Sequence, residues 1–171
     1  MSNKYLIGSI AAFVLYVLVQ ALLIRDLVLF NVFFPFLYIG FLLLLPLDVD
    51  RITLILLGFF CGFTVDFFYD SMGVNSAACT LIAFLRPHWL RVVVPAGGYE
   101  DFEVPSMNAL GITWFMTYAL PLVFTHHLVL FYLEAGGFHL FFNTLLKVMA
   151  STVYTFLLLL IVQMLFYKER N

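Results

Sequence analysis

Long apolar runs follow one another along this whole chain, and only a few polar residues separate them. A membrane-spanning helix needs about 20 mainly apolar residues to cross roughly 30 Å of hydrocarbon. Six runs approach that length, and they predict helices at residues 5–24, 27–47, 52–69, 74–90, 107–133 and 138–167. We therefore expect an all-α integral membrane protein, with residues 1–171 forming one membrane domain of six transmembrane helices.

The composition supports this prediction, since 64% of the 171 residues are hydrophobic and only 11% are charged. Soluble domains contain roughly 45–50% apolar and about 25% charged residues. A soluble fold could not bury so much apolar surface, so membrane lipids are the first partner we expect. The net charge of -2 argues against nucleic acid as a partner.

The third and fourth predicted helices are joined by a tight turn at residues 70–73, so they form a helical hairpin. They are either two full spans or a re-entrant pair, and their length favours full spans. Residues 91–106 contain prolines, glycines and acidic residues and form the longest polar stretch, which we predict to be a loop.

Basic residues indicate the orientation of the chain, because lysine and arginine are enriched in cytoplasmic loops. Arg25 is the one basic loop residue on the opposite side. Six basic residues lie at alternate ends of the predicted helices, namely Lys4, Arg51, Arg86, Arg91, Lys168 and Arg170. We expect both termini and the loop at residues 91–106 to be cytoplasmic.

Ionisable groups at membrane depth are costly, so each one needs a reason. Asp66 and Asp70 are four residues apart and should share one face of the third helix. Paired carboxylates can perform acid–base chemistry or bind cations, but an interfacial cap or a structural hydrogen bond is the preferred interpretation here. Lys147 lies at a similar depth in the sixth helix, and an ion pair with Asp66 or Asp70 would lower the cost of burial.

The third helix also contains Gly58 and Gly62, a G-x-x-x-G pattern that allows two helix backbones to approach closely. Cys61 and Cys79 are interpreted as small buried packing residues. His126 and His127 are adjacent, which is poor geometry for a shared metal, and we expect them near the interface. Because no motif of a known catalytic site is present, the sequence predicts no catalytic residues, no cofactor and no metal.

The hairpin has a more specific pattern, because Gly58, Gly62 and Asp66 form a G-x-x-x-G-x-x-x-D helix that is followed by a turn containing Gly73. This pattern resembles the rod shape-determining protein MreD family of bacterial inner membranes. The chain length, the short loops, Pro35 early in the second predicted helix and the predicted cytoplasmic ends also fit that family.

The resemblance implies a non-catalytic membrane protein of the cell-elongation complex, which couples the MreB cytoskeleton to peptidoglycan synthases. Its implied partners are a bitopic MreC-like protein and the cell-wall synthases, and its implied fold is similar to the substrate-binding subunits of ECF-type vitamin transporters. Residues expected to serve helix packing or partner binding are Gly58, Gly62, Asp66, Asp70, Gly73 and Lys147.

The alternative is the substrate-binding membrane subunit of a vitamin or metal transporter. Such a subunit needs several polar residues that converge from different helices on one pocket. The first, second and fifth predicted helices offer few of them: Gln20, Asn31, Thr113 and Thr117. This scarcity favours the scaffold.

Overall fold

The computed structural model describes residues 3–100, 102–138 and 140–165, and all regular elements within these ranges are helices. In chain order they are α1 (Asn3–Val19), the π-helical turn η1 (Gln20–Ile24), α2 (Ile39–Leu43), α3 (Arg51–Tyr69), α4 (Val74–Val92), α5 (Met107–Leu110), α6 (Ile112–Glu134) and α7 (Phe141–Leu165). Among the described residues, three helices, α3, α6 and α7, are long and apolar enough to cross a membrane. The prediction of an all-helical chain with helices suited to a membrane is confirmed.

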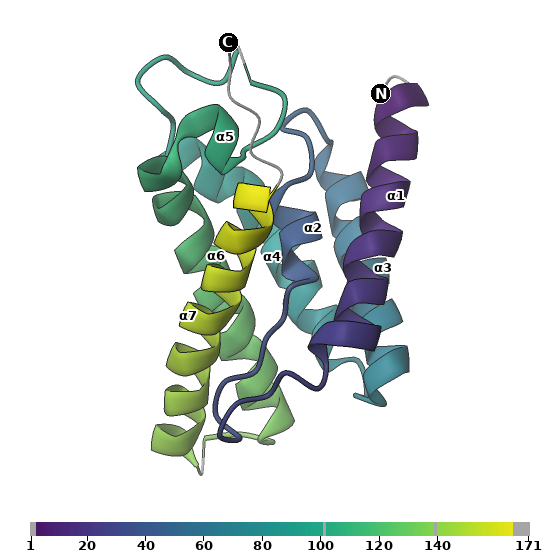
Figure 1. The fold of residues 1–171 in the computed structure, drawn as a ribbon, viewed down its shortest axis with the longest axis vertical. Helices are drawn as coiled ribbons and strands as arrows, with labels where there is room; N and C mark the ends of the chain where they lie inside the picture. Colours follow the sequence, from purple (N-terminus) through teal and green to yellow (C-terminus); the bar gives the residue numbers. More distant parts are fainter. Residues whose placement is uncertain (1–2, 101, 139, 166–171) are drawn as a thin grey trace.

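The helices lie side by side, with α3 packed against α4, α4 against α6, and α6 against α7. The start of α1 and the end of α7 lie at the same end of the molecule (Figure 1). At that end, the backbone N–H of Leu47 donates to the carbonyl of Glu103 at 2.9 Å. At the opposite end, the guanidinium of Arg25 donates to the carbonyl of Phe68 at 2.9 Å. The two sets of connections therefore lie at opposite ends of the bundle.

The predicted second helix, residues 27–47, is wrong as a continuous helix, because only α2 is α-helical within it. Pro35 supplies no backbone N–H and disfavours the helical conformation of Phe34 before it. Further upstream, Phe30 and Asn31 adopt positive φ angles of 53° and 55° in a tight turn. The chain therefore reverses direction at this turn, and we call residues 32–47, which contain the short helix α2, the irregular segment.

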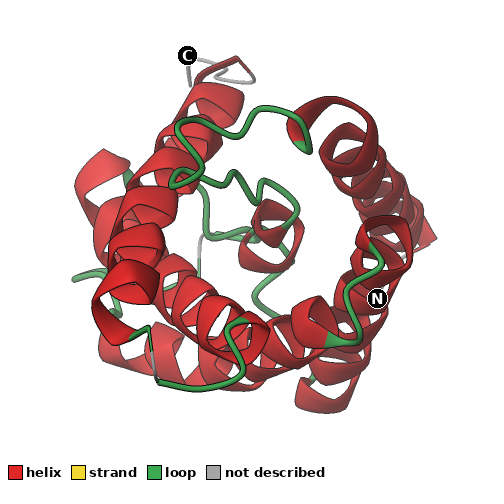
Figure 2. Ribbon diagram, turned by 90° about the horizontal axis from the view of Figure 1, so that it is seen from below, coloured by secondary structure: helices red, strands yellow, loops and turns green. Residues whose placement is uncertain are grey.

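Most of this irregular segment lies inside the bundle rather than on its surface. All residues from 35 to 43 are buried, and Tyr38, Ile39, Leu42 and Leu43 have no exposed surface. Viewed end-on, the segment that contains α2 lies within a ring of longer helices (Figure 2). Non-helical backbone at membrane depth is tolerated where protein surrounds it and satisfies its hydrogen bonds. The surrounding helices must therefore supply donors and acceptors to this segment.

The other helix bounds differ less from the predictions. Helix α4 continues through Pro87 to Val92, and the stretch predicted at residues 107–133 is divided into α5 and α6 by Gly111, which has a φ of +84°. Helix α7 begins at Phe141 rather than at residue 138. Residues 166 and 167 of the predicted sixth helix lie outside the described residues.

Pro121 lies within α6 without ending it. A proline leaves the carbonyl four residues earlier without its helical donor, here the carbonyl of Thr117. The indole Nε1 of Trp89 on α4 points at this place and donates to the carbonyls of Thr117 and Tyr118 at 3.3 and 3.1 Å. The break in the α6 hydrogen-bond ladder thus becomes a contact between two helices.

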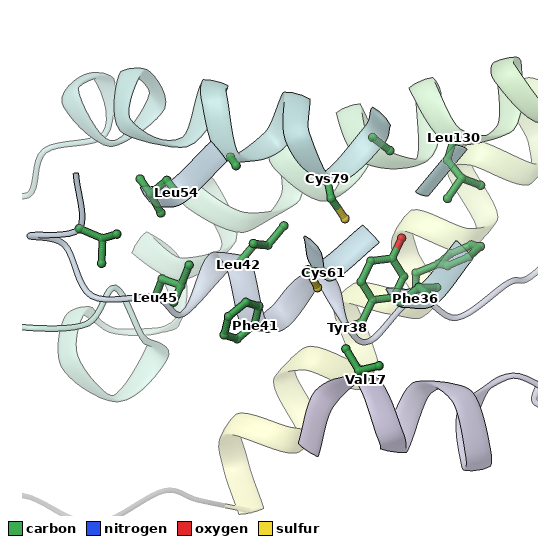
Figure 3. Packing of buried hydrophobic residues seen from close by; sticks show 14 of the residues in the cluster. Val17, Phe36, Tyr38, Phe41, Leu42, Leu45, Leu54, Cys61, Cys79 and Leu130 are labelled. Carbon is green, nitrogen blue, oxygen red and sulfur yellow. The ribbon is translucent and has the colours of Figure 1, made fainter. Parts of the chain in front are cut away.

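Side chains from α1, α3, α4, α6, α7 and the irregular segment form the apolar core. Figure 3 shows Val17, Tyr38, Cys61 and Cys79 gathered within it. Both cysteines are free and have no exposed surface. The prediction that they are small buried packing residues is confirmed.

Candidate functional site: the α3–α4 hairpin and the polar interior

The glycines of α3 mark the face on which α4 lies. A Cβ atom at Gly58 would lie 2.7 Å from the Cβ of Ala83 and 2.8 Å from the carbonyl oxygen of Cys79. A Cβ atom at Gly62 would lie 2.5 Å from the Cα of Ser76. Real Cβ atoms do not approach other heavy atoms this closely, so the two helices can pack at this separation only with glycine at both positions.

Asp66 lies one helical turn beyond Gly62 and faces the start of α4. Its carboxylate accepts hydrogen bonds from the backbone N–H groups of Asn75 and Ser76 at 2.9 and 2.8 Å. It also accepts bonds from the side chains of Ser71, Asn75 and Ser76, at 2.7, 3.0 and 2.5 Å. A carboxylate at a helix N-terminus satisfies N–H groups that have no partner within the helix. The structural-hydrogen-bond interpretation of Asp66 therefore agrees with the structure.

Asp70 and Gly73 shape the turn between the two helices. Asp70 ends α3 with a left-handed conformation, at a φ of 54°, and its side chain is exposed. Gly73 precedes α4 with a φ of +86°, a region that favours glycine. Asp66, Asp70 and Gly73 line one cavity of about 440 Å³. The structure therefore brings these three predicted residues together. Asp66 is the one whose side chain forms the hydrogen bonds to the start of α4 described above.

Lys147 occupies a different place from the one we expected. Its Nζ atom lies 5.4 Å from the centre of the Phe34 ring, in the geometry of a cation–π contact. Within the described part of the chain, neither Asp66 nor Asp70 forms an ion pair with it, so the predicted pairing is corrected. The sequence argument placed these charges at a similar depth, but it could not place the irregular segment beside α7.

Side chains from two neighbouring helices satisfy the backbone of the irregular segment. The hydroxyl groups of Ser151 and Thr155 on α7 accept hydrogen bonds from the backbone N–H groups of Phe34 and Phe36 at 2.9 and 3.0 Å. Gln20 in η1 donates from Nε2 to the carbonyl of Pro35 at 2.9 Å. These bonds replace the hydrogen bonds that a continuous helix would supply.

The far end of the irregular segment is held by Arg86, which is 1% exposed. Its guanidinium donates to the carbonyls of Leu45 and Pro46, and its Nε donates to the hydroxyl of Tyr118 at 2.9 Å. Tyr118 in turn donates to the carbonyl of Leu43 at 2.8 Å. Arg86 was expected at the end of its helix, but α4 continues to Val92 and the Arg86 side chain is buried in the bundle.

A chain of hydrogen bonds crosses the interior from α6 to α3. Tyr38 donates its hydroxyl hydrogen to Oδ1 of Asn75 at 2.7 Å, and Nε2 of His126 lies 2.9 Å from the same hydroxyl. Because Tyr38 has one hydrogen to donate, Nε2 of His126 carries the hydrogen between them. The amide of Asn75 then donates to Asp66. Four elements, α6, the irregular segment, α4 and α3, are thus connected through polar side chains.

The two histidines are fully buried, which corrects the expectation that they lie near the interface. Nε2 of His127 lies 3.2 Å from the hydroxyl of Thr155, and its Nδ1 lies 2.6 Å from the carbonyl of Val123. Among the residues that the structure describes, Nδ1 of His126 has no hydrogen-bond partner. Within the described residues, no group of three or more histidine, cysteine or acidic side chains is arranged to hold a metal ion.

Cys79 and His126 resemble a nucleophile–base pair in composition, with Sγ 3.7 Å from Nε2. The hydrogen on that Nε2 already forms the bond to Tyr38, and both side chains have no exposed surface. A nucleophile needs a base that can accept its proton and a path for the substrate. This pair therefore has the geometry of core packing rather than that of a reactive centre.

The polar interior is the part of the site that sequence analysis missed. Its members are spread over the chain as Gln20, Tyr38, Asn75, Arg86, Tyr118, His126, Ser151 and Thr155. One signal was available, because Ser151 and Thr155 are four residues apart and therefore lie on one face of α7. A polar stripe on a membrane helix indicates that the helix faces protein rather than lipid.

No protein-family model, no curated protein and no solved structure matches the chain. The function must therefore be argued from the hairpin and the interior alone.

Proposed function

We propose that the chain is a non-catalytic scaffold of the bacterial inner membrane, similar to the MreD family, that binds an MreC-like bitopic partner in the cell-elongation complex and supports peptidoglycan synthesis. The observation that carries this proposal is the α3–α4 hairpin. The residues that suggested the family, Gly58, Gly62, Asp66 and Gly73, each have a structural role in that hairpin. A pattern that builds a rigid helix pair is what a scaffold requires.

We infer that the chain crosses the membrane six times and has a fold similar to the substrate-binding subunits of ECF-type vitamin transporters. The six crossings are α1, the irregular segment with α2, α3, α4, α6 and α7. Supporting this, alternate crossings end at the same end of the bundle. Leu47 after the second crossing bonds Glu103 after the fourth, and Arg25 after the first crossing bonds Phe68 at the end of the third. The irregular segment can cross because its residues 35–43 are buried among the helices (Figure 2).

The proposed orientation places both termini in the cytoplasm. Lys4, Arg51 and Arg91 lie at the ends of α1, α3 and α4, whereas Arg86 is buried within the bundle. Lys168 and Arg170 lie outside the described residues, and in the sequence they follow the sixth predicted helix. Arg25 remains the basic loop residue at the opposite end. The remaining excess supports the same orientation by the positive-inside rule.

The packing of the interior supports a scaffold over a transporter subunit. A substrate pocket in the bundle would need free polar groups around an open space. Tyr38, Ile39, Leu42 and Leu43 of the irregular segment lie at the centre with no exposed surface. The polar side chains near them bond backbone groups of that segment, so they are engaged in holding the fold.

The outer face of α3 is available to lipid and to a partner. Phe59, Phe60, Phe63 and Phe67 are exposed there, and Phe67 is 80% exposed. In a membrane these rings contact acyl chains or the transmembrane helix of another protein. A rigid hairpin with an apolar outer face is suited to binding the single membrane helix of a bitopic protein.

The test is chemical crosslinking and affinity purification of the tagged full chain from bacterial membranes. The expected result is a bitopic protein with a large periplasmic domain, together with loss of rod shape when the chain is depleted. Gly62→Leu should reduce recovery of that partner, whereas Gly8→Leu should not, because a Cβ at Gly8 meets nothing within 4 Å. A copurified ATPase module or a bound vitamin would instead identify a transporter subunit and refute the proposal.

A further inference from the structure

The strongest unassigned feature is a cavity of about 350 Å³ at the end of the bundle where α4 ends. Two arginines, Arg86 and Arg91, line it together with Leu47 and Tyr99. Arg86 is buried, whereas Arg91 is exposed in the last turn of α4. Two guanidinium groups at one cavity attract an anion.

The charge of Arg86 is solvated by neutral groups. Its hydrogen bonds go to Tyr118 and to the carbonyls of Leu45 and Pro46, and among the described residues no carboxylate accepts one. Within the described ranges, the one hydrogen bond of its Nη1 is long, at 3.5 Å to the carbonyl of Pro46. Buried charges in proteins are usually paired with an opposite charge, so an anion in this cavity would stabilise the buried guanidinium of Arg86.

A second cavity, of about 520 Å³, lies directly beside the first and is lined by residues of opposite charge. Asp48, Glu100 and Glu103 line it, and it shares Leu47 and Tyr99 with the cavity of the two arginines. A positive and a negative recess are therefore separated by one leucine and one tyrosine. A ligand that carries a phosphate at one end and a cation a few bonds away complements both recesses.

Aromatic residues beside the two cavities are of the kind that lies at the level of lipid headgroups. Tyr99 donates its hydroxyl hydrogen to the carbonyl of Leu90 at 2.8 Å, and Nε1 of Trp114 donates to the carbonyl of Val93 at 2.7 Å. Tryptophan and tyrosine concentrate at the boundary between the hydrocarbon and the headgroups. A phosphate held beside Arg86 and Arg91 would thus lie at the depth of phospholipid phosphates.

We propose that the two cavities together bind the headgroup of a zwitterionic phospholipid with a primary ammonium, such as phosphatidylethanolamine. The phosphate lies against Arg86 and Arg91, and the ammonium lies against Asp48 and Glu100. A primary ammonium donates hydrogen bonds to carboxylates, which a trimethylated ammonium cannot do. This binding depends on the two cavities and is independent of the scaffold function.

Native mass spectrometry of the full chain tests the proposal, with phosphatidylethanolamine, phosphatidylcholine and phosphatidylglycerol as probes. Phosphatidylethanolamine should be retained most strongly. Arg91→Gln should weaken retention of all three lipids by about fivefold, the usual effect of one basic residue near a membrane surface. Glu100→Gln should weaken retention of phosphatidylethanolamine without weakening that of phosphatidylglycerol, because the latter has no ammonium.

The matched control is Arg51→Gln, which removes an exposed arginine at the start of α3 that lines neither cavity. It should leave retention unchanged. Equal retention of the three lipids, or loss of retention in the control to the same extent as in Arg91→Gln, would overturn the proposal. Inorganic phosphate or free phosphoethanolamine that competes as strongly as the lipid would overturn the assignment to a lipid and identify a soluble ligand.

Discussion

The close contact at Gly62 gives the sharpest test of the packing argument, through the single substitution Gly62→Ala. The added methyl carbon would lie 2.5 Å from the Cα of Ser76 and from the carbonyl carbon of Asn75. Both are backbone atoms of α4 and cannot rotate away. An ordinary contact between carbon atoms is about 3.5–4.0 Å, so α4 would have to move away from α3 by roughly 1 Å.

The displacement of α4 lowers stability, whereas alanine in place of glycine raises the stability of the helix itself. Overpacking of a well-packed interior costs about 1–3 kcal/mol, and moving α4 also weakens the hydrogen bonds from Asn75 and Ser76 to Asp66, each worth about 1 kcal/mol. Alanine is more favourable than glycine in a helix interior by about 0.5–1 kcal/mol. We therefore expect Gly62→Ala to lower the free energy of unfolding by about 1–3 kcal/mol.

Gly8→Ala is the matched control, because it makes the same chemical change in α1, where a Cβ meets nothing within 4 Å. It should raise stability slightly, by up to about 1 kcal/mol. The assay is equilibrium unfolding of the purified chain in mixed detergent micelles, followed by tryptophan fluorescence. If the two variants change stability in the same direction, glycine at position 62 is not required for the approach of α4, and the packing argument fails.

Four further predictions follow from named contacts. Asp66→Asn should lower the free energy of unfolding by about 1–3 kcal/mol in the same assay, because an amide cannot accept all the hydrogen bonds that the carboxylate receives. The control Asp70→Asn, at an exposed side chain, should change it by less than about 0.5 kcal/mol. Equal effects of the two substitutions would contradict the capping role of Asp66. The effects of Lys147→Met and Asp66→Asn on the free energy of unfolding should add within about 0.5 kcal/mol in the double variant. A larger coupling would show that the two side chains do form an ion pair. Reporter fusions should be cytoplasmic at the C-terminus and periplasmic in the turn after α6, and the reverse would overturn the orientation. The backbone N–H of Thr53 in α3 donates to the carboxylate of Asp50 and lowers its pKa. The native chain should therefore be more stable than Asp50→Ala by a constant amount near neutral pH, and this difference should disappear as the pH falls through the lowered pKa. A difference that grows in acid would be inconsistent with the cap.

The parts of the fold that follow from local pattern were predicted well. The hairpin required only a short polar turn between two apolar runs, and its close-contact face required only glycines four residues apart. The capping role of Asp66 could be anticipated, because structural hydrogen bonds are the simplest way to lower the energetic cost of a carboxylate near the end of a membrane helix. The buried cysteines followed from their apolar surroundings.

The irregular segment could not be predicted from hydropathy, because an apolar run has the same hydropathy whether it is a helix in lipid or irregular backbone inside the protein. Pro35 was compatible with a helix start, so its presence did not exclude one. The positions of His126 and Lys147 depend on that segment, since both contact it in the folded chain. One missed break in a helix thus led to the errors at these two positions.

The irregular segment also constrains the order in which the protein can be assembled. Its backbone at Phe34 and Phe36 bonds Ser151 and Thr155, which are made more than a hundred residues later. In the proposed membrane arrangement, those amide groups have no permanent acceptor until α7 has entered the membrane, because hydrocarbon offers none. The newly made segment must therefore wait at the membrane surface, in the translocation channel or beside an insertion factor until α7, which is synthesised much later, supplies the two hydroxyl groups.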